Sequence, residues 1–187
     1  MGGPALTLAS SSPQRRAILE QLGLEFSVAE PDAQERTEGE AQELVLANAL
    51  AKARSVQGEL VLAVDTAVEL DYRVLGKPSD EAEARSYLRL LEGRTHRVWS
   101  GLALVREGNE QLGSSVTLVH FRPLGPREID WYAETGEWRE RAGGYAIQER
   151  GAALVDRIEG DYTNVVGLPV ARLVRLAPEL LVGNRRD

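Results

Sequence analysis

The segment LTLASSSPQRRAIL, residues 6–19, predicts a strand that turns directly into a helix. The apolar run Leu6–Ala9 has the length of a short strand, three serines follow it, and Pro13 suits the first turn of a helix, where its missing N–H is no loss. The free backbone amides at such a helix start favour an anion. Arg15 and Arg16 stand in the same turn, where cations are unfavourable by roughly a few tenths of a kcal/mol unless an anion is bound. The segment therefore predicts either a phosphate grip or a capped surface helix with two solvated arginines.

The rest of the chain alternates between helical and strand patterns. Helices are expected at about 40–57, 80–91 with Ser79 as its cap, 126–135 and 169–177. Strands are expected at 60–65, in a hairpin over 68–75, and around 96–105 and 114–122, whereas 27–40 is expected to be an acidic loop. This order is typical of an α/β fold with a mixed twisted sheet flanked by helices. Because no linker is evident, we expect one domain over residues 1–187, with two lobes around a shared cleft.

Composition narrows the class of protein. The net charge of −7 argues against polymeric nucleic acid as the main partner. Cysteine is absent and there are only two histidines, so any metal should be bound by oxygen ligands, as Mg²⁺ or Mn²⁺ is. No apolar run approaches the roughly 20 residues of a membrane span, and no targeting segment is evident, so we expect a cytoplasmic protein without a membrane partner. The core is the default expectation for three tryptophans, Trp99, Trp131 and Trp138, with a dimer interface or the wall of the cleft as alternatives.

Asp65 and Lys52 are candidates for chemistry by their positions. Asp65 ends the apolar run LVLAV, and ligands in α/β sheets gather at the carboxyl ends of strands. Its carboxylate can accept a proton from water or help to hold Mg²⁺, or it can simply cap the turn that ends the strand. Lys52 lies at one edge of the apolar stripe of its helix, so it either extends outward along that edge or points its ammonium into a polar cleft.

Three further side chains are candidates with simpler alternatives. Lys77 precedes Pro78, which restrains it to extended geometry and can aim its ammonium at a phosphate; the alternative is a solvated turn lysine. Glu35 lies in the acidic loop, where plain solvation is the alternative. Gln148 follows apolar residues, and its amide offers donors and an acceptor to the edge of a base or to the surrounding backbone.

Eight short motifs occur in one order between residues 6 and 176. They are LASSSPQR at 8–15, PDAQE at 31–35, ALAKA at 49–53, AVDT at 63–66, LGKP at 75–78, GRTHRV at 93–98, GYAIQ at 144–148, and GDY with VGLP in 160–169. Together they resemble the Maf family of nucleoside triphosphate pyrophosphatases. Two positions depart from the family pattern: valine precedes Asp65 where GADT is usual, and Gln14 replaces the first arginine of SPRR.

The resemblance implies hydrolysis of a nucleoside triphosphate between its α and β phosphates, which gives a monophosphate and pyrophosphate. It implies that Asp65 accepts the proton of the attacking water and that Glu35 and Asp65 help to bind Mg²⁺ or Mn²⁺. It also implies a nucleotide-binding cleft between the lobes and a homodimer. The positions that match the phosphate-gripping residues of the family are Ser10, Arg15, Lys52 and Lys77.

Substrate choice follows from the same resemblance. Thr66 directly after Asp65, together with Gln148, resembles the branch that acts on dTTP and UTP rather than the 7-methyl-GTP branch, and the expected role is removal of unwanted or modified pyrimidine triphosphates. Gln14 stands at a position that the family links to base selection. Compared with the usual arginine, its neutral amide removes one positive charge and its side chain is shorter. An alternative function is a nucleotide-binding regulator of septum formation or cell division with little catalysis.

Overall fold

Seven strands form one mixed sheet in the computed structural model, which describes residues 5–182. They are β1 Leu6–Ala9, β2 Phe26–Ala29, β3 Leu60–Leu70, β4 Arg73–Leu75, β5 Thr95–Arg106, β6 Asn109–Phe121 and β7 Val155–Glu159. Their order is β2-β1-β3-β5-β6-β7, and β4 pairs with β3. The first three strands are parallel to one another, and the remaining pairs are antiparallel. The prediction of an α/β fold with a mixed sheet is confirmed.

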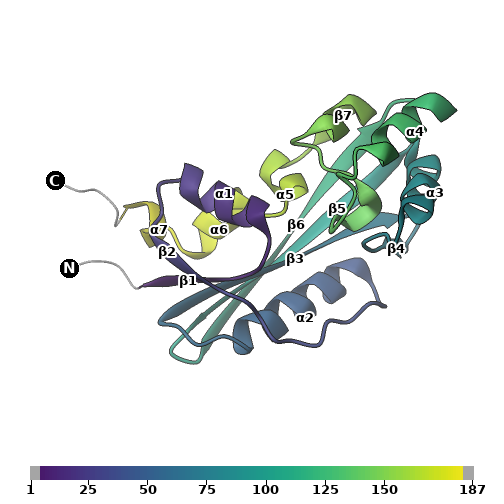
Figure 1. Ribbon diagram of the computed structural model, residues 1–187. Helices are drawn as coiled ribbons and strands as arrows, with labels where there is room; N and C mark the ends of the chain where they lie inside the picture. The colour runs from purple at the N-terminus through teal and green to yellow at the C-terminus, as the bar shows by residue number, and fades with distance from the viewer. Residues whose placement is uncertain (1–4, 183–187) are drawn as a thin grey trace.

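Helices cover both faces of this sheet. They are α1 Pro13–Gln21, α2 Ala41–Arg54, α3 Glu81–Leu91, α4 Pro126–Glu134, α5 Tyr162–Val166, α6 Val170–Leu176 and α7 Glu179–Val182, with 3₁₀ turns η1 Ala142–Gly144 and η2 Arg150–Leu154. Figure 1 shows α2 alone on one face, with α1, α5 and α6 on the other and α3 and α4 near the far ends of the long strands. Among the described helices, none is both long and apolar enough to span a membrane.

Several boundaries differ from those expected from the sequence. The strand predicted to end at Asp65 continues to Leu70, because β5 pairs with it as far as Glu69 and its later side chains are buried as well. The cap of α3 is Asp80 rather than Ser79, since the Asp80 carboxylate accepts the Glu83 N–H. β2 and β7 were not predicted. β2 is four residues long, too short for a clear alternation, and most of it lies in the segment 27–40 that was wrongly expected to be entirely loop; in β7 the two apolar residues are three positions apart.

The position of α2 depends on a glycine in β5. A Cβ at Gly101 would lie 2.3 Å from the carbonyl oxygen of Val45, so only glycine lets this helix approach the sheet so closely. Gly101 is the β5 residue that pairs with Asp65 of β3. The helix face that follows Val45 is therefore held against Asp65.

The core on the α1 and α6 face divides into two large clusters, one around Val64 and one around Val68. Both residues belong to β3, where alternate side chains share a face. Thr66 stands between them on that face, at the point where the two clusters meet. The prediction of one domain over 1–187 stays a prediction, and residues 1–4 and 183–187 lie outside the described part of the chain.

The tryptophan prediction is only partly confirmed. Trp138 is buried, and its indole N–H donates to the carbonyl of Ala133. Trp99 is partly buried and donates to Glu69. Trp131 is 45% exposed on α4, so its assignment to the core was wrong.

Candidate active site

A cavity of about 680 Å³ opens beside the middle of β3. On this edge β1 pairs with β3 only up to Ala63 and β4 pairs only from Val68, so the described strands leave residues 64–67 without a neighbour there. Side chains from both faces of the sheet can therefore reach one pocket over the free edge. Every site residue predicted from the sequence lines it: Ser10, Gln14, Arg15, Glu35, Lys52, Asp65, Thr66, Lys77 and Gln148.

The start of α1 forms one wall of this pocket. Ser12 caps the helix by accepting the Arg15 N–H at 3.5 Å, and its own hydroxyl donates to Gln14 Oε1 at 3.0 Å. Ser10 lies below the cap, 4% exposed, and its Oγ accepts the Ser12 N–H at 3.2 Å. The predicted strand-to-helix turn is confirmed, and its serines hold the first turn of the helix open toward the cavity.

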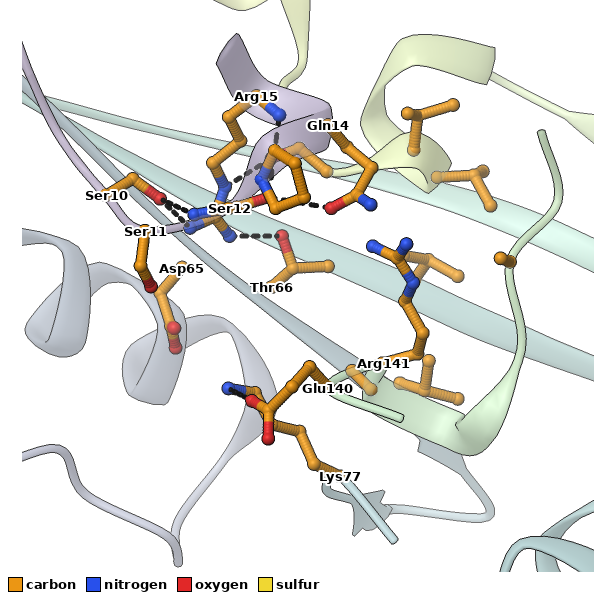
Figure 2. A pocket seen from close by; sticks show the side chains of 18 of the residues that line it. Ser10, Ser11, Ser12, Gln14, Arg15, Asp65, Thr66, Lys77, Glu140 and Arg141 are labelled. Atoms are coloured by element: carbon orange, nitrogen blue, oxygen red, sulfur yellow. Dashed lines mark hydrogen bonds and ion pairs between the residues drawn. The ribbon is translucent and has the colours of Figure 1, made fainter. Parts of the chain in front are cut away.

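Arg15 is locked in place by three contacts from different parts of the chain. Its Nε donates to the Gly167 carbonyl at 2.9 Å, and its two terminal nitrogens donate to Ser10 Oγ at 3.1 Å and Thr66 Oγ1 at 3.2 Å (Figure 2). Burial lowers the pKa of the Arg15 guanidinium below its ordinary 12.5, while the charges of Asp65 and Glu35 raise it. A guanidinium has five N–H groups, so two remain for an anion in the pocket. The solvated alternative for Arg15 is therefore excluded, whereas Arg16 is exposed.

Lys52 joins the two predicted acidic residues. Its Nζ lies 2.6 Å from Asp65 Oδ1 and 3.1 Å from Glu35 Oε1. Lys52 is 7% exposed and Asp65 8% exposed, whereas the Glu35 side chain is half exposed. Lys52 thus points into the cleft rather than outward, because α2 presents this face to β3.

Asn48 completes the arrangement, and the sequence analysis missed it. Its Nδ2 donates to Asp65 Oδ2 at 3.0 Å and to the Arg36 carbonyl, while its Oδ1 accepts the Arg36 N–H at 2.8 Å. It therefore fixes the carboxylate of Asp65 and also anchors the loop that carries Glu35. Asn48 and Lys52 are four residues apart on a predicted helix, which places both on one face, and this spacing was the available signal.

A second group lies farther out and is defined here as the outer end of the pocket: Lys77, Glu140 and Arg141. Lys77 Nζ lies 2.7 Å from Glu140 Oε2, and both side chains are more than half exposed. Arg141 Nη2 lies 3.4 Å from Glu149 Oε1. Neither Glu140 nor Arg141 was predicted as a site residue. Figure 2 shows all three across the pocket from Ser10 and Arg15.

The loop that carries Gln148 is fixed by two buried phenol groups. His96 Nε2 lies 2.8 Å from the hydroxyl of Tyr145, and the Tyr132 hydroxyl accepts the Ala146 N–H at 2.9 Å. Burial lowers the pKa of His96 to about 3 and raises the pKa of Tyr145, so both are neutral near pH 7. Gln148 is half-buried at the end of this loop, as expected from its apolar neighbours.

The carboxylates of the pocket are the side chains that could bind a divalent cation. Within residues 5–182 no group of three or more histidine, aspartate or glutamate side chains could hold a metal. Glu35 and Asp65 bring two carboxylates to one point, joined by the ammonium of Lys52. Mg²⁺ commonly uses one or two carboxylates together with substrate phosphates and water. These residues fit such a cation, provided that the substrate supplies further ligands.

Comparison with known protein families shows the family to which this chain belongs. The family described as Maf-like protein matches residues 5–180, which include the helix start, the α2 face, the free edge of β3 and the Gln148 loop. The chain belongs to the Maf family.

Three relatives with known names are similar to this chain over most of its length. A protein of Symbiobacterium thermophilum is 49% identical over 177 residues, with 91% of each chain covered, and one of Thermus thermophilus is 48% identical over 180 residues, with 94% of each covered. A third, from Thermococcus gammatolerans, is 45% identical over 174 residues, with 91% of this chain and 94% of the relative covered. All three are named dTTP/UTP pyrophosphatase.

Proposed function

We propose that this protein is a nucleoside triphosphate pyrophosphatase that hydrolyses dTTP and UTP between the α and β phosphates. The observation that carries the proposal is the placement of Asp65, with both carboxylate oxygens held, beside an arginine and a lysine in a pocket large enough for a nucleotide. Phosphoryl transfer needs mainly positioning and charge neutralisation, and this pocket supplies both. Identities of 45–49% to proteins named dTTP/UTP pyrophosphatase support the choice of substrate.

In this mechanism the phosphates lie against the start of α1. Arg15 and the free amides of the first turn bind them, with Ser10 holding the guanidinium in position, and Lys77 reaches them from the outer end of the pocket. Asp65 accepts the proton of the attacking water. Asn48 and Lys52 each donate to one oxygen of Asp65, so its carboxylate is held in one orientation toward the phosphates.

The cofactor in this proposal is Mg²⁺ or Mn²⁺, held by Glu35 and Asp65 together with phosphate oxygens. When bound, it would offset part of the roughly four negative charges of a triphosphate and polarise the phosphate under attack. The residues of the chain keep their roles beside it: Lys52 keeps the two carboxylates together, and Arg15 binds the phosphates from the opposite wall.

Three further features of the proposal concern the protein in its setting. Thr66, Gln14 and Gln148 bind the nucleoside and select the pyrimidine, including modified pyrimidines whose removal is a house-cleaning task. The protein is a homodimer, as the family resemblance implies, which light scattering on the purified chain tests directly. It acts in the cytoplasm, where nucleoside triphosphates are made and used.

The test is a panel assay with purified protein and Mg²⁺ or Mn²⁺ on the common NTPs, dNTPs and 7-methyl-GTP, with pyrophosphate and phosphate measured separately. Release of pyrophosphate, fastest with dTTP or UTP, is expected. Asp65→Asn removes the proton acceptor while retaining its size, and should lower kcat by about 10²–10⁴-fold. Folded wild-type protein that binds nucleotides without releasing pyrophosphate would contradict the proposal and favour a regulator.

Glu69→Gln is the matched control for this variant. Glu69 lies four residues further along β3 on the same face, is 7% exposed, and accepts a hydrogen bond from Trp99 outside the pocket. It should keep its activity. A comparable loss in both variants would show that the effect comes from disturbing β3 rather than from removing the base.

A further inference from the structure

Arg141 is a pocket residue that the reaction described above does not use. It lines the cavity from the segment just before η1, and its side chain is about one-fifth exposed. Its Nε is buried and has no hydrogen-bond partner among the described residues. Protein atoms cover this Nε, so hydrogen bonding of the guanidinium is incomplete on the protein side, and a ligand acceptor at its accessible terminal N–H groups would offset part of that cost.

The surroundings of Arg141 suit a neutral acceptor better than a phosphate. Glu149 lies 3.4 Å from its Nη2, so part of the positive charge is offset while other N–H donors of the guanidinium are left for a ligand. Apolar side chains line the same cavity, among them Val98, Val165 and Val166, and such a wall suits the flat faces of a base. Figure 2 shows Arg141 well separated from Asp65 and pointing toward Gln14.

Gln14 presents a matching donor from the opposite wall. Its Oε1 accepts the hydroxyl of Ser12, and this hydroxyl is free to donate because its lone pairs receive the Arg15 N–H. The amide oxygen is therefore occupied, and the NH₂ group is the part of Gln14 that remains for a ligand. The pocket thus offers N–H donors from two sides.

We propose that Arg141 is a specificity-determining residue that, together with the Gln14 amide, reads the carbonyl groups of uracil or thymine. This inference rests on the proposed function and adds Arg141 to the residues proposed there to select the base. Uracil and thymine present carbonyl acceptors at C2 and C4, whereas cytosine presents an amino donor at C4. A site with N–H donors facing both positions accepts the first two bases and leaves the donor that faces C4 unpaired against the third.

The experiment compares kcat/KM for UTP and CTP, and inhibition by UMP and CMP, in the wild type, Arg141→Gln, Arg141→Lys and a control. Arg141→Gln should lower kcat/KM for UTP by about 10- to 100-fold, which corresponds to one hydrogen bond to a charged group, and change that for CTP by less than about threefold. Arg141→Lys keeps the charge but loses the planar fork, so it should lose the preference for UTP as well. The control Arg150→Gln removes an exposed arginine that pairs with Glu137 and should behave as the wild type.

Two results would overturn the inference while leaving the proposed function intact. Equal losses for UTP and CTP, or recovery of both by Arg141→Lys, would mean that Arg141 binds phosphate through its charge. A wild-type protein that hydrolyses no nucleotide would instead overturn the proposed function, and the role of Arg141 in it.

Discussion

The two ends of the pocket are built in different ways. The buried end, defined as Ser10, Arg15, Lys52, Asp65 and Thr66, draws on α1, α2, β3 and the turn after β1, which are joined by hydrogen bonds between residues 5 to 51 positions apart in the sequence. The outer end, Lys77, Glu140 and Arg141, stands on loops, and its ion pair is exposed to solvent. Because exposed pairs contribute little to stability, the difference predicts that changes at the buried end affect folding and catalysis together, whereas changes at the outer end affect the ligand alone.

Replacing Lys52 by methionine gives the largest expected combined effect on turnover and stability. The variant removes the ammonium between Asp65 and Glu35 and leaves two carboxylates facing each other. We expect kcat/KM to fall by about 10²–10³-fold, as for loss of one preorganised donor, and the free energy of unfolding to fall by about 3 kcal/mol, as when one partner of a buried pair is removed. Pyrophosphate release and urea unfolding measure the two effects.

Arg54→Met on the same helix is the control for this variant. Arg54 also forms an ion pair, with Glu110 at 2.6 Å, but its side chain is 60% exposed and lies outside the pocket. The change should leave both the urea unfolding midpoint and turnover close to those of the wild type, because exposed ion pairs contribute little to stability. If Lys52→Met were equally mild, the buried pair would not organise the site.

The difference between the buried end and the outer end of the pocket also explains which residues could be predicted from the sequence. The strand-to-helix turn and the main helices follow local rules of periodicity, proline placement and capping, and these were found. The roles of Asp65 and Lys52 depended on the family resemblance, because their alternatives could not be separated from residue order alone. Asn48 was missed because its partners, Asp65 and Arg36, meet only after α2 packs on Gly101. At the outer end Lys77 was predicted, but Glu140 and Arg141 were missed, because only the fold of the loop before Tyr145 brings these two charged residues to the cleft.

A smaller effect concerns His96, which supports the loop that carries Gln148 through Tyr145. Its pKa is about 3 in the folded chain against an ordinary 6.5, so between these values the unfolded chain binds a proton that the folded chain does not. Stability is therefore complete above about pH 6.5 and is lost as the pH falls toward 3. At pH 5 this one group should lower the free energy of unfolding by about 2 kcal/mol relative to pH 8, which urea titrations at both values measure.

His96→Phe should remove this part of the pH dependence, since the ring remains and the titrating group is lost. His120→Phe is the control, because His120 is the other of the two histidines and contacts Thr95 and Glu159 rather than Tyr145. It should retain the decrease between pH 8 and pH 5. An unchanged decrease in His96→Phe would assign the pH dependence to other groups.

Lys77→Met gives the smallest expected effect on stability. It tests most directly whether the outer end of the pocket, unlike the buried end, affects the ligand alone. Its ammonium pairs with Glu140 in solvent, so the free energy of unfolding should change by less than about 1 kcal/mol. The same ammonium is placed to bind phosphate, so KM for UTP should rise about tenfold, the scale of one charged hydrogen bond, with kcat little changed. Glu140→Gln separates the two roles, because it breaks the ion pair but keeps the cation: it should leave stability unchanged and KM no higher than in the wild type. Unfolding of Lys77→Met at markedly lower urea would instead show that the outer end stabilises the fold, and the distinction between the two ends would be lost.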